Sequence, residues 1–310
     1  MGRTIQKVAL TGATGNVGAP ILKNLLRNNF QVTVLTRSAD HAFPNGVNVH
    51  VVDYSSSASL ESALRGCDAC VDANLTQDDT PIRLMNAAAA VGVYRYIPSD
   101  YSLDPFNPKL NALPVFAMKD ARDRHLFKVC EQSSGSMTWS IVCNGPFLDW
   151  NLRTGFKGID LYNKKATIMG TGTNKHPWTM LDDVGKAVAG ILLKPVETEN
   201  RPVFVYSVVK SDEEMLKLAQ EALGSDAWVV KTVDPQATFD KAVADLKAGI
   251  INMQVFGDMI RFSNTQPDMA HPWHSPDNEL LGVQEMSDDE VQVIIKSIVE
   301  KKLFKRAGEL

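Results

Sequence analysis

The chain has 310 residues, of which 44% are hydrophobic and 22% are charged, and this fits one compact unit or one domain with a smaller appendage. Its formal net charge is -4, and Lys and Arg are spread along the chain, which excludes the concentrated basic surface of a nucleic-acid-binding protein. No apolar run approaches the ~18 residues of a membrane span, so we expect no membrane association and a cytoplasmic location.

The first predicted unit is a buried strand at 8–10 followed by a helix at 17–26, whose apolar residues recur at helical spacing. Gly12, Gly15 and Gly18 lie where the strand turns into the helix. Gly12 allows a tight turn, Gly15 leaves room for a pyrophosphate, and Gly18 lets the helix pack close to the strand. Free N–H groups and the helix dipole would face the phosphate, so we predict a nucleotide site rather than an ordinary glycine-rich turn.

A second strand at 30–36 is rich in β-branched residues and ends at Arg37, with Ser38 beside it. In a dinucleotide-binding fold this strand end reaches the adenosine ribose, where an acid bonds a free 2′-hydroxyl and an arginine accepts a 2′-phosphate. Arg37 therefore favours NADP(H) over NAD(H). A solvated loop arginine is the alternative interpretation.

Strands and helices then alternate up to about residue 150. We expect strands at 47–53, 69–75, 93–97 and 138–144, a short helix capped by Ser59, and helices at 80–90 and 116–131. This alternation predicts a doubly wound parallel sheet of the Rossmann-like α/β class over residues 1–150. Ligands bind at the carboxyl ends of such strands, so 12–18, Arg37, 74–77 and 99–101 should line one crevice.

The regular alternation ends near Trp150, and we expect residues 151–310 to form a smaller α+β substrate domain over the crevice. Strands are predicted at 166–169 and 203–208, and a helix at 182–193, with the segment 176–208 returning to the main sheet. Later helices begin with capping boxes at Ser211 and Ser287. The longest predicted loop runs from 266 to 282.

Cysteine and histidine spacing gives no metal prediction. Cys67 and Cys70 match a redox or zinc spacing, but they lie at a turn and in a buried strand without a second Cys or His pair, so we expect packing residues. Cys130 and Cys143 are expected to be reduced as well. His271 and His274 lack a Cys or acid cluster at metal spacing.

The whole chain resembles the isoflavone reductase-like group of the NmrA-like family, which are atypical short-chain dehydrogenases/reductases. The resemblance rests on Thr11-Gly12-x-x-Gly15-x-x-Gly18, Arg37, Ile97-Pro98-Ser99-Asp100-Tyr101, Lys119, Asn144-Gly145-Pro146-Phe147 and the closing helix from Ser287. The family usually shows Pro-Ser-Glu-Phe-Gly after the fifth strand. This chain has Asp100, Tyr101 and Ser102 in place of the last three residues of the pattern. The departure affects the shape of the site on the side where the substrate would bind.

From the residues alone Lys119 looks unremarkable, because Lys119 and Asp123 read as an i, i+4 surface pair. The resemblance implies a different role, in which Lys119 lies beside the nicotinamide and handles the proton. His125 and His176 are read as structural. The Tyr-x-x-x-Lys pair of ordinary short-chain reductases is matched only by Tyr206 and Lys210, which fall in a predicted strand that would separate them by roughly 13 Å.

The resemblance and the motifs together imply a set of site residues. Those expected to contact NADP(H) are Thr11, Gly12, Thr14, Gly15, Asn16, Val17, Gly18, Arg37, Ser38, Asn74, Ser99, Lys119, Asn144, Pro146 and Phe147. Those expected to contact the substrate are Tyr101, Met118, Phe147, Trp150 and Trp178, which suit a small aromatic or apolar molecule.

The expected activity is NADPH-dependent hydride transfer to an electron-poor double bond (C=C conjugated to a carbonyl, C=O or C=N) of a small aromatic metabolite, with Lys119 as the catalytic residue. The alternative is a non-catalytic redox sensor of the NmrA type that binds the dinucleotide and regulates a protein. The glycine motif does not distinguish the two. A monomer or a homodimer is expected in either case.

Overall fold

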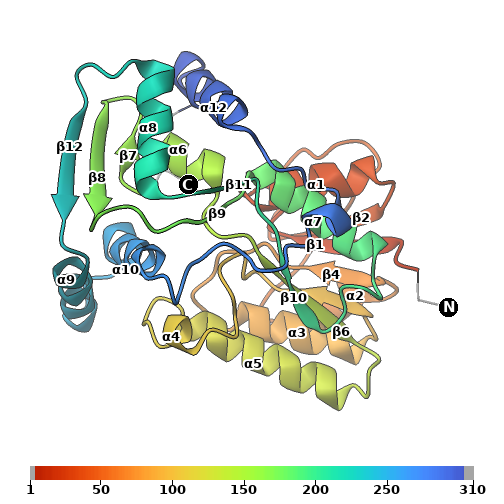
Figure 1. The fold of residues 1–310 in the computed structure, drawn as a ribbon. Helices are drawn as coiled ribbons and strands as arrows, with labels where there is room; N and C mark the ends of the chain where they lie inside the picture. The colour runs from red at the N-terminus through yellow and green to blue at the C-terminus, as the bar shows by residue number, and fades with distance from the viewer. Residues whose placement is uncertain (1–3, 304–310) are drawn as a thin grey trace.

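The computed structural model describes residues 4–303 and is built around a seven-stranded parallel sheet (Figure 1). Its strand order is β10-β6-β5-β4-β1-β2-β3. The strands are β1 (Lys7–Thr11), β2 (Gln31–Thr36), β3 (Asn48–Val51), β4 (Ala69–Val71), β5 (Arg95–Ile97), β6 (Thr138–Cys143) and β10 (Arg201–Phe204). The chain moves outward one way from β1 and the other way from β4, so the topological switch point, where ligands bind in such folds, lies between these two strands.

Helices cover both faces of this sheet, as a doubly wound fold requires. On one face lie α1 (Gly18–Arg27) and α7 (Leu181–Leu193), and on the other α2 (Ser57–Leu64), α3 (Thr80–Ala90) and α5 (Ala117–Gln132), with the short α4 (Pro108–Asn111) before α5 (Figure 1). Successive strand residues face opposite sides, so Leu10 packs toward α1 and Ala9 toward α3. The predicted Rossmann-like class is confirmed.

A smaller α+β part lies to the upper left of the large sheet in Figure 1. One of its sheets has the order β12-β8-β7, and in the other β9 pairs antiparallel with β11. These strands are β7 (Ile159–Asp160), β8 (Lys165–Met169), β9 (His176–Trp178), β11 (Val208–Lys210) and β12 (Val229–Val233). Its helices are α6 (Leu148–Thr154), α8 (Asp212–Leu223), α9 (Pro235–Lys247), α10 (Met253–Thr265) and α12 (Asp288–Glu300), whereas the short α11 (Asn278–Leu281) packs on α7 beside the large sheet.

Both predicted capping boxes are confirmed. The hydroxyl of Ser211 accepts from the N–H of Glu214 at 3.1 Å, while the Glu214 carboxylate accepts from the Ser211 N–H at 2.9 Å. Ser287 and Glu290 make the same reciprocal pair at the start of α12. Each box satisfies N–H groups that have no partner within the helix.

Three local predictions are wrong. The cap of α2 is Ser56, whose hydroxyl accepts from the backbone N–H of Ser59, so Ser59 lies one turn inside the helix. The strand predicted at 203–208 is divided between β10 and β11, which belong to different sheets. The predicted loop at 266–282 contains the short helix α11, which ends at Gly282 with a φ of 69°.

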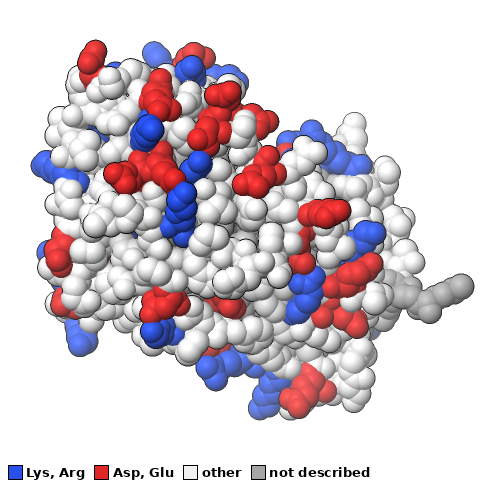
Figure 2. Space-filling model, viewed as in Figure 1, with Lys and Arg blue, Asp and Glu red and all other residues white. Residues whose placement is uncertain are grey.

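Acidic and basic side chains are interspersed on the face shown in Figure 2, so no field of one sign covers that face. Among residues 4–303, no helix combines the length and the apolar character needed to cross a membrane.

Candidate functional site

The turn after β1 has a shape that only glycine fits at two positions. Gly12 has a φ of +63°, and a Cβ there would lie 2.4 Å from the carbonyl oxygen of Ala73. A Cβ on Gly18 would lie 2.0 Å from the carbonyl oxygen of Gly12. The helix α1 begins after Val17, which offers no side-chain cap. The N–H of Ala19 donates to the Gly15 carbonyl at 3.0 Å and Pro20 has no N–H, whereas the N–H groups of Asn16, Val17 and Gly18 have no acceptor among residues 4–303 and remain available to an anion.

Asp72, just after β4, ties the strand ends around this turn together. Its Oδ1 accepts from the Thr11 hydroxyl at 2.6 Å and from the Asn74 N–H at 3.0 Å, and its backbone carbonyl accepts from the Tyr101 hydroxyl at 3.1 Å. Ser99 donates to the carbonyl of Asn74 at 2.8 Å. Full burial raises the pKa of Asp72, and the bonds from Thr11 and Asn74 oppose that shift. We did not single out Asp72 from the sequence, although a carboxylate directly after an apolar strand was a visible signal.

Arg37 lies at the end of β2 with an exposed side chain, and it makes no ion pair or hydrogen bond with another residue of 4–303. The neighbouring loop is ordered by its own side chains. Thr36 donates to the carbonyl of Ser38 at 2.9 Å, and the Ser38 hydroxyl donates to Asp40 at 2.5 Å. The guanidinium at the end of β2 therefore has no partner among residues 4–303. Thr14 is exposed and Asn16 half-buried on the glycine turn.

Lys119, early in α5, faces the turn that follows β5. Its ammonium donates to the backbone carbonyl of Asp100 and lies 3.0 Å from Oδ1 of the same residue, whose side chain is 5% exposed. Asp123, expected on the surface, is instead buried one helical turn later. Burial raises the pKa of Asp123 well above its usual range, the neighbouring Asp100 raises it further, and Lys119 opposes the shift. Lys119 thus has a different acid partner from the predicted one.

The loop after β6 is held against β9. Asn144 is fully buried, and its carbonyl accepts from the Thr179 hydroxyl at 2.5 Å. Gly145 has a φ of +62°, and a Cβ there would lie 2.4 Å from the carbonyl oxygen of Pro177. A β-bridge joins Phe147 to Thr179. The Asn144-Gly145-Pro146-Phe147 motif is therefore positioned by the smaller part of the molecule.

The residues predicted to contact the substrate divide into two groups. Met118 is 42% exposed, and Phe147 and Trp150 are half-buried. Trp178 is only 1% exposed, lies in the core of the smaller part and donates its indole N–H to the carbonyl of Lys210, so its assignment to the substrate site is wrong. Tyr101 is 7% exposed, and its hydroxyl is already used on Asp72, which gives it a supporting role.

Tyr206 and Lys210 do not form a catalytic pair. Tyr206 lies between β10 and β11 with its hydroxyl 3.4 Å from Glu285, while Lys210 makes a 2.7 Å ion pair with Asp288. Cys67 is half-buried and Cys70 is fully buried in the core between the sheet and α2. Burial raises the pKa of both thiols. His125 contacts Asn86 at 2.7 Å on the outer part of α5.

A doubly wound parallel sheet with a glycine turn at its switch point defines the Rossmann-like class of dinucleotide-binding folds. The model of the NmrA-like family matches residues 4–272, and the chain belongs to this family.

Curated relatives and solved structures agree with this assignment. The chain is 30% identical to oxidoreductase poxI of Penicillium oxalicum over 92% of both chains, and 30% identical to oxidoreductase aprR of Aspergillus flavus over 78% of this chain and 82% of that protein. A crystal structure of isoflavone reductase superposes with a TM-score of 0.73 at 17% identity, covering 93% of this chain and 99% of the other. Triphenylmethane reductase of Citrobacter gives 0.70 at 16% identity, covering 95% and 99%. At these identities the superpositions show a shared fold.

Proposed function

We propose that the protein is an NADPH-dependent reductase that acts on an electron-poor double bond of a small aromatic molecule, with Lys119 as its proton donor. The observation that carries this proposal is the Lys119 ammonium, which is held on Asp100 at the turn after β5, at the carboxyl edge of the sheet. The curated relatives are named oxidoreductases, and solved structures with the same fold include leucoanthocyanidin reductase with NADPH.

The residues at the switch point fit a dinucleotide phosphate. Side chains are excluded at Gly12 and Gly18, which leaves bare backbone at the start of α1, and N–H groups there would hold the pyrophosphate. Arg37 would pair with the 2′-phosphate, and Ser99, Asn74 and Asn144 lie on strand ends that reach the same edge. The chemistry that NADPH supplies when bound is a hydride from its nicotinamide.

Lys119 would supply the proton that completes the reduction. Negative charge builds on a conjugated or carbonyl-type acceptor as it is reduced, and an ammonium stabilises that charge and donates a proton to it. The Asp100 carboxylate and carbonyl keep the lysine side chain in one position.

The substrate surface is inferred from the partly exposed apolar side chains near these groups. Met118, Phe147 and Trp150 offer an apolar contact for an aromatic ring, and Trp150 packs on Phe156 with ring centroids 5.1 Å apart. Structures of the same fold include one with NADP+ and (+)pinoresinol and one of a reductase of triphenylmethane dyes. Aromatic enones, ketones and imines are therefore the compounds to screen by NADPH oxidation.

The decisive variant is Lys119→Met, which keeps the length of the side chain and removes the ammonium. Because a positioned general acid contributes about 10²–10⁴ in rate, turnover should fall at least a hundred-fold while NADPH affinity changes little. Lys128→Met, at an exposed position of the same helix, is the matched control and should keep normal turnover. Near-normal activity of Lys119→Met would remove the lysine from the mechanism. NADPH binding without oxidation of any compound would favour the sensor instead.

A further inference from the structure

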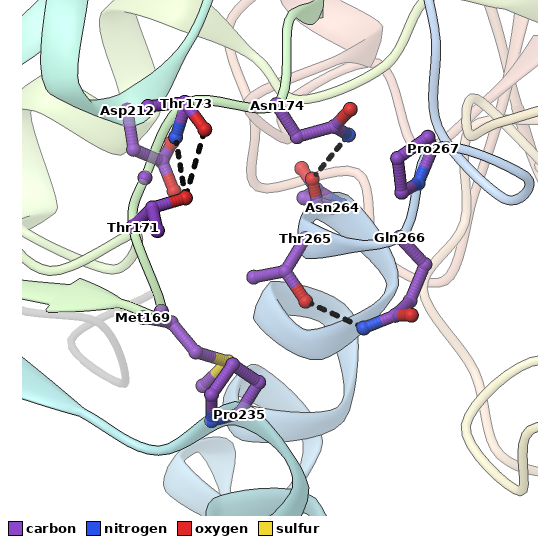
Figure 3. A pocket seen from close by; sticks show the side chains of 12 residues that line it. Met169, Thr171, Thr173, Asn174, Asp212, Pro235, Asn264, Thr265, Gln266 and Pro267 are labelled. Carbon is purple, nitrogen blue, oxygen red and sulfur yellow. Dashed lines mark hydrogen bonds between the residues drawn. The ribbon is translucent and has the colours of Figure 1, made fainter.

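A cavity of about 380 Å³ opens in the smaller part of the molecule, away from the glycine turn (Figure 3). It lies between the β8–β9 connection, the first residue of α8, the start of α9 and the end of α10. Its polar lining includes Thr171, Thr173, Asn174, Asp212, Asn264 and Gln266. Met169, Pro235 and Pro267 supply an apolar wall. No aromatic side chain and no cation is among the residues that line it. The absence of a cation argues against an anionic ligand.

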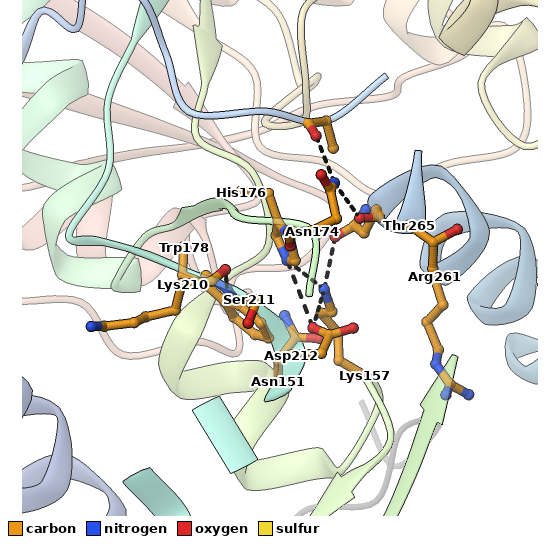
Figure 4. A network of polar contacts seen from close by, with 12 residues as sticks. Asn151, Lys157, Asn174, His176, Trp178, Lys210, Ser211, Asp212, Arg261 and Thr265 are labelled. Atoms are coloured by element: carbon orange, nitrogen blue, oxygen red, sulfur yellow. Dashed lines mark hydrogen bonds and ion pairs between the residues drawn. The ribbon is translucent and has the colours of Figure 1, made fainter. Parts of the chain in front are cut away.

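A buried cluster of polar residues stands directly behind this cavity (Figure 4). The Lys157 ammonium lies 2.9 Å from Asp212 Oδ1, 2.8 Å from Asn264 Oδ1 and 2.7 Å from His176 Nε2, and 4.3 Å above the Trp178 ring. The Lys157 side chain is 2% exposed. Asp212 and Asn264 belong both to this cluster and to the wall of the cavity, so the cluster fixes the polar groups that the cavity presents.

The hydrogen bonds assign the charges within the cluster. His176 Nδ1 lies 3.0 Å from the carbonyl oxygen of Asn174, which only accepts, so Nδ1 carries the proton and Nε2 accepts from Lys157. Burial, followed by the charge of Lys157, lowers the pKa of His176 to about 3. Burial raises the pKa of Asp212, but the surrounding groups, Lys157 foremost, together outweigh burial, and the net shift is downward. Lys157 and Asp212 remain as one cation and one anion whose charges cancel, and the nearby Arg261 guanidinium is balanced by Asp258 at 3.6 Å.

The free polar atoms of the cavity are mainly acceptors. The Nδ2 of Asn174 already donates to the carbonyls of Asn264 and Ala270, and the Nε2 of Gln266 donates to Thr265. Within residues 4–303 no hydrogen bond reaches Asp212 Oδ2, Asn174 Oδ1 or Gln266 Oε1. Asp212 is only 6% exposed as a residue, yet Oδ2 is not among the fully buried oxygens that lack a partner, so this oxygen is open to the cavity and available to a donor.

We propose that this cavity binds a small neutral molecule through its hydroxyl groups, which donate to Asp212 Oδ2 and to the amide oxygens of Asn174 and Gln266. A neutral donor suits the site because Lys157 already balances the charge of Asp212, so neither an anion nor a cation gains from the field. The apolar wall accommodates the carbon skeleton of an alcohol or a phenol.

The strand β9 links the wall of the cavity to the loop after β6. From Asn174 the chain reaches Pro177 in three residues, roughly 10 Å, and the Pro177 carbonyl lies against Gly145 of the loop after β6. The hydroxyl group therefore belongs either to the far end of the reductase substrate or to a separate ligand. Both sources share the same chemistry at Asp212.

Equilibrium binding of resorcinol to the full chain tests the proposal, with 1,3-dimethoxybenzene as a probe of similar shape without donors. Resorcinol should bind at least ten-fold more tightly than its ether. Thr173→Trp, at an exposed position on the rim, should weaken resorcinol at least ten-fold by filling the cavity, and Gln266→Met should weaken it about three-fold. Thr232→Trp, on the exposed strand β12, is the matched control and should bind normally.

Equal affinity for resorcinol and its ether, or unchanged binding by Thr173→Trp, would overturn the proposal. Binding is measured without turnover, and Lys119→Met should leave it intact, so a failed reductase assay does not affect this result. Once a substrate is known, competitive inhibition by resorcinol assigns the cavity to the substrate's own hydroxyl end, and non-competitive inhibition assigns it to a separate ligand. Either pattern supports hydroxyl recognition.

Discussion

Arg37 and Lys157 are two cations in opposite surroundings, and the difference decides what each can bind. Arg37 is exposed and has no ion-pair partner within residues 4–303, so its charge is available to a ligand. Lys157 is buried against Asp212, His176 and Asn264, and its charge is already balanced. A guanidinium pairs with phosphate through a planar fork of donors, which suits Arg37 to the 2′-phosphate of NADP(H).

Changing Arg37 to Asp tests the cofactor preference. A charge-assisted hydrogen bond contributes about 1.5–3 kcal/mol, so Arg37→Asp should weaken NADPH ten-fold or more and leave NADH nearly unchanged. Both dissociation constants can be measured by nicotinamide fluorescence. Arg65→Asp, at the exposed C-cap position of α2, is the control. Equal losses for the two cofactors would contradict the assignment of Arg37.

His176 should make stability depend on pH. Its folded pKa is lowered to about 3 by burial and by Lys157, from an ordinary value of 6.5, so the unfolded chain binds the additional proton. The stabilisation is complete above pH 6.5 and is lost as the pH falls toward 3, and the loss by pH 5 is about 2 kcal/mol.

The matched variant for that measurement is His176→Gln, whose amide can donate to Asn174 and accept from Lys157 without titrating. The free energy of unfolding in urea is measured at pH 7.5 and at pH 5 for both proteins. The decrease between the two pH values should be about 2 kcal/mol smaller for His176→Gln than for the unmodified chain. His274→Gln, at an exposed position, should follow the unmodified chain. Identical pH profiles for all three would show that the pKa of His176 is the same in the folded and the unfolded chain.

At the scale of helices and strands, short sequence motifs correctly predicted the features that depend only on residues close together in the chain. The capping boxes at Ser211 and Ser287 and the glycine turn after β1 are complete within a few residues, and all three are present in the structure. Ser59 was misassigned because several serines lie close together and only the entry of the chain into α2 selects Ser56. The strand ending at Val71 is shorter than predicted, since Asp72 bonds to Thr11.

Elements formed by long-range contacts were harder to find. The segment β12-α9-α10 was not predicted, although Asp234 caps α9 with Pro235 in its first turn and gives a readable signal. The polar groups of the site depend on partners that are distant in sequence. Asp72 lies 61 positions from Thr11, and Lys157 lies 107 positions from Asn264. Spacing along the chain carries no information about such pairs, so the glycine turn was predictable and the buried cluster was not.

At the scale of the whole molecule, the second half of the chain supports the first. The strand β10 extends the large sheet beside β6, and α7 packs on α1, the helix that follows the glycine turn. Asn24 of α1 donates to the carbonyl of Asp182, and Lys23 makes a 2.7 Å ion pair with its carboxylate. The geometry of the nucleotide site therefore depends on residues near position 185 as well as on its own motif.

Gly185 of α7 is the closest point of this packing, and Gly185→Ala is the variant that tests it. A Cβ there would lie 2.5 Å from the carbonyl oxygen of Pro20 and 2.7 Å from Asn24 Nδ2. Helix propensity alone favours alanine by about 1 kcal/mol, whereas overpacking costs about 1–3 kcal/mol. We expect a net loss of stability in urea unfolding and, because Pro20 lies in the first turn of α1, weaker NADPH binding. The control is Leu193→Ala, at a half-exposed position at the end of the same helix, which should change neither stability nor NADPH binding. A Gly185→Ala protein as stable as the unmodified chain would show that α7 can move away from α1 without cost.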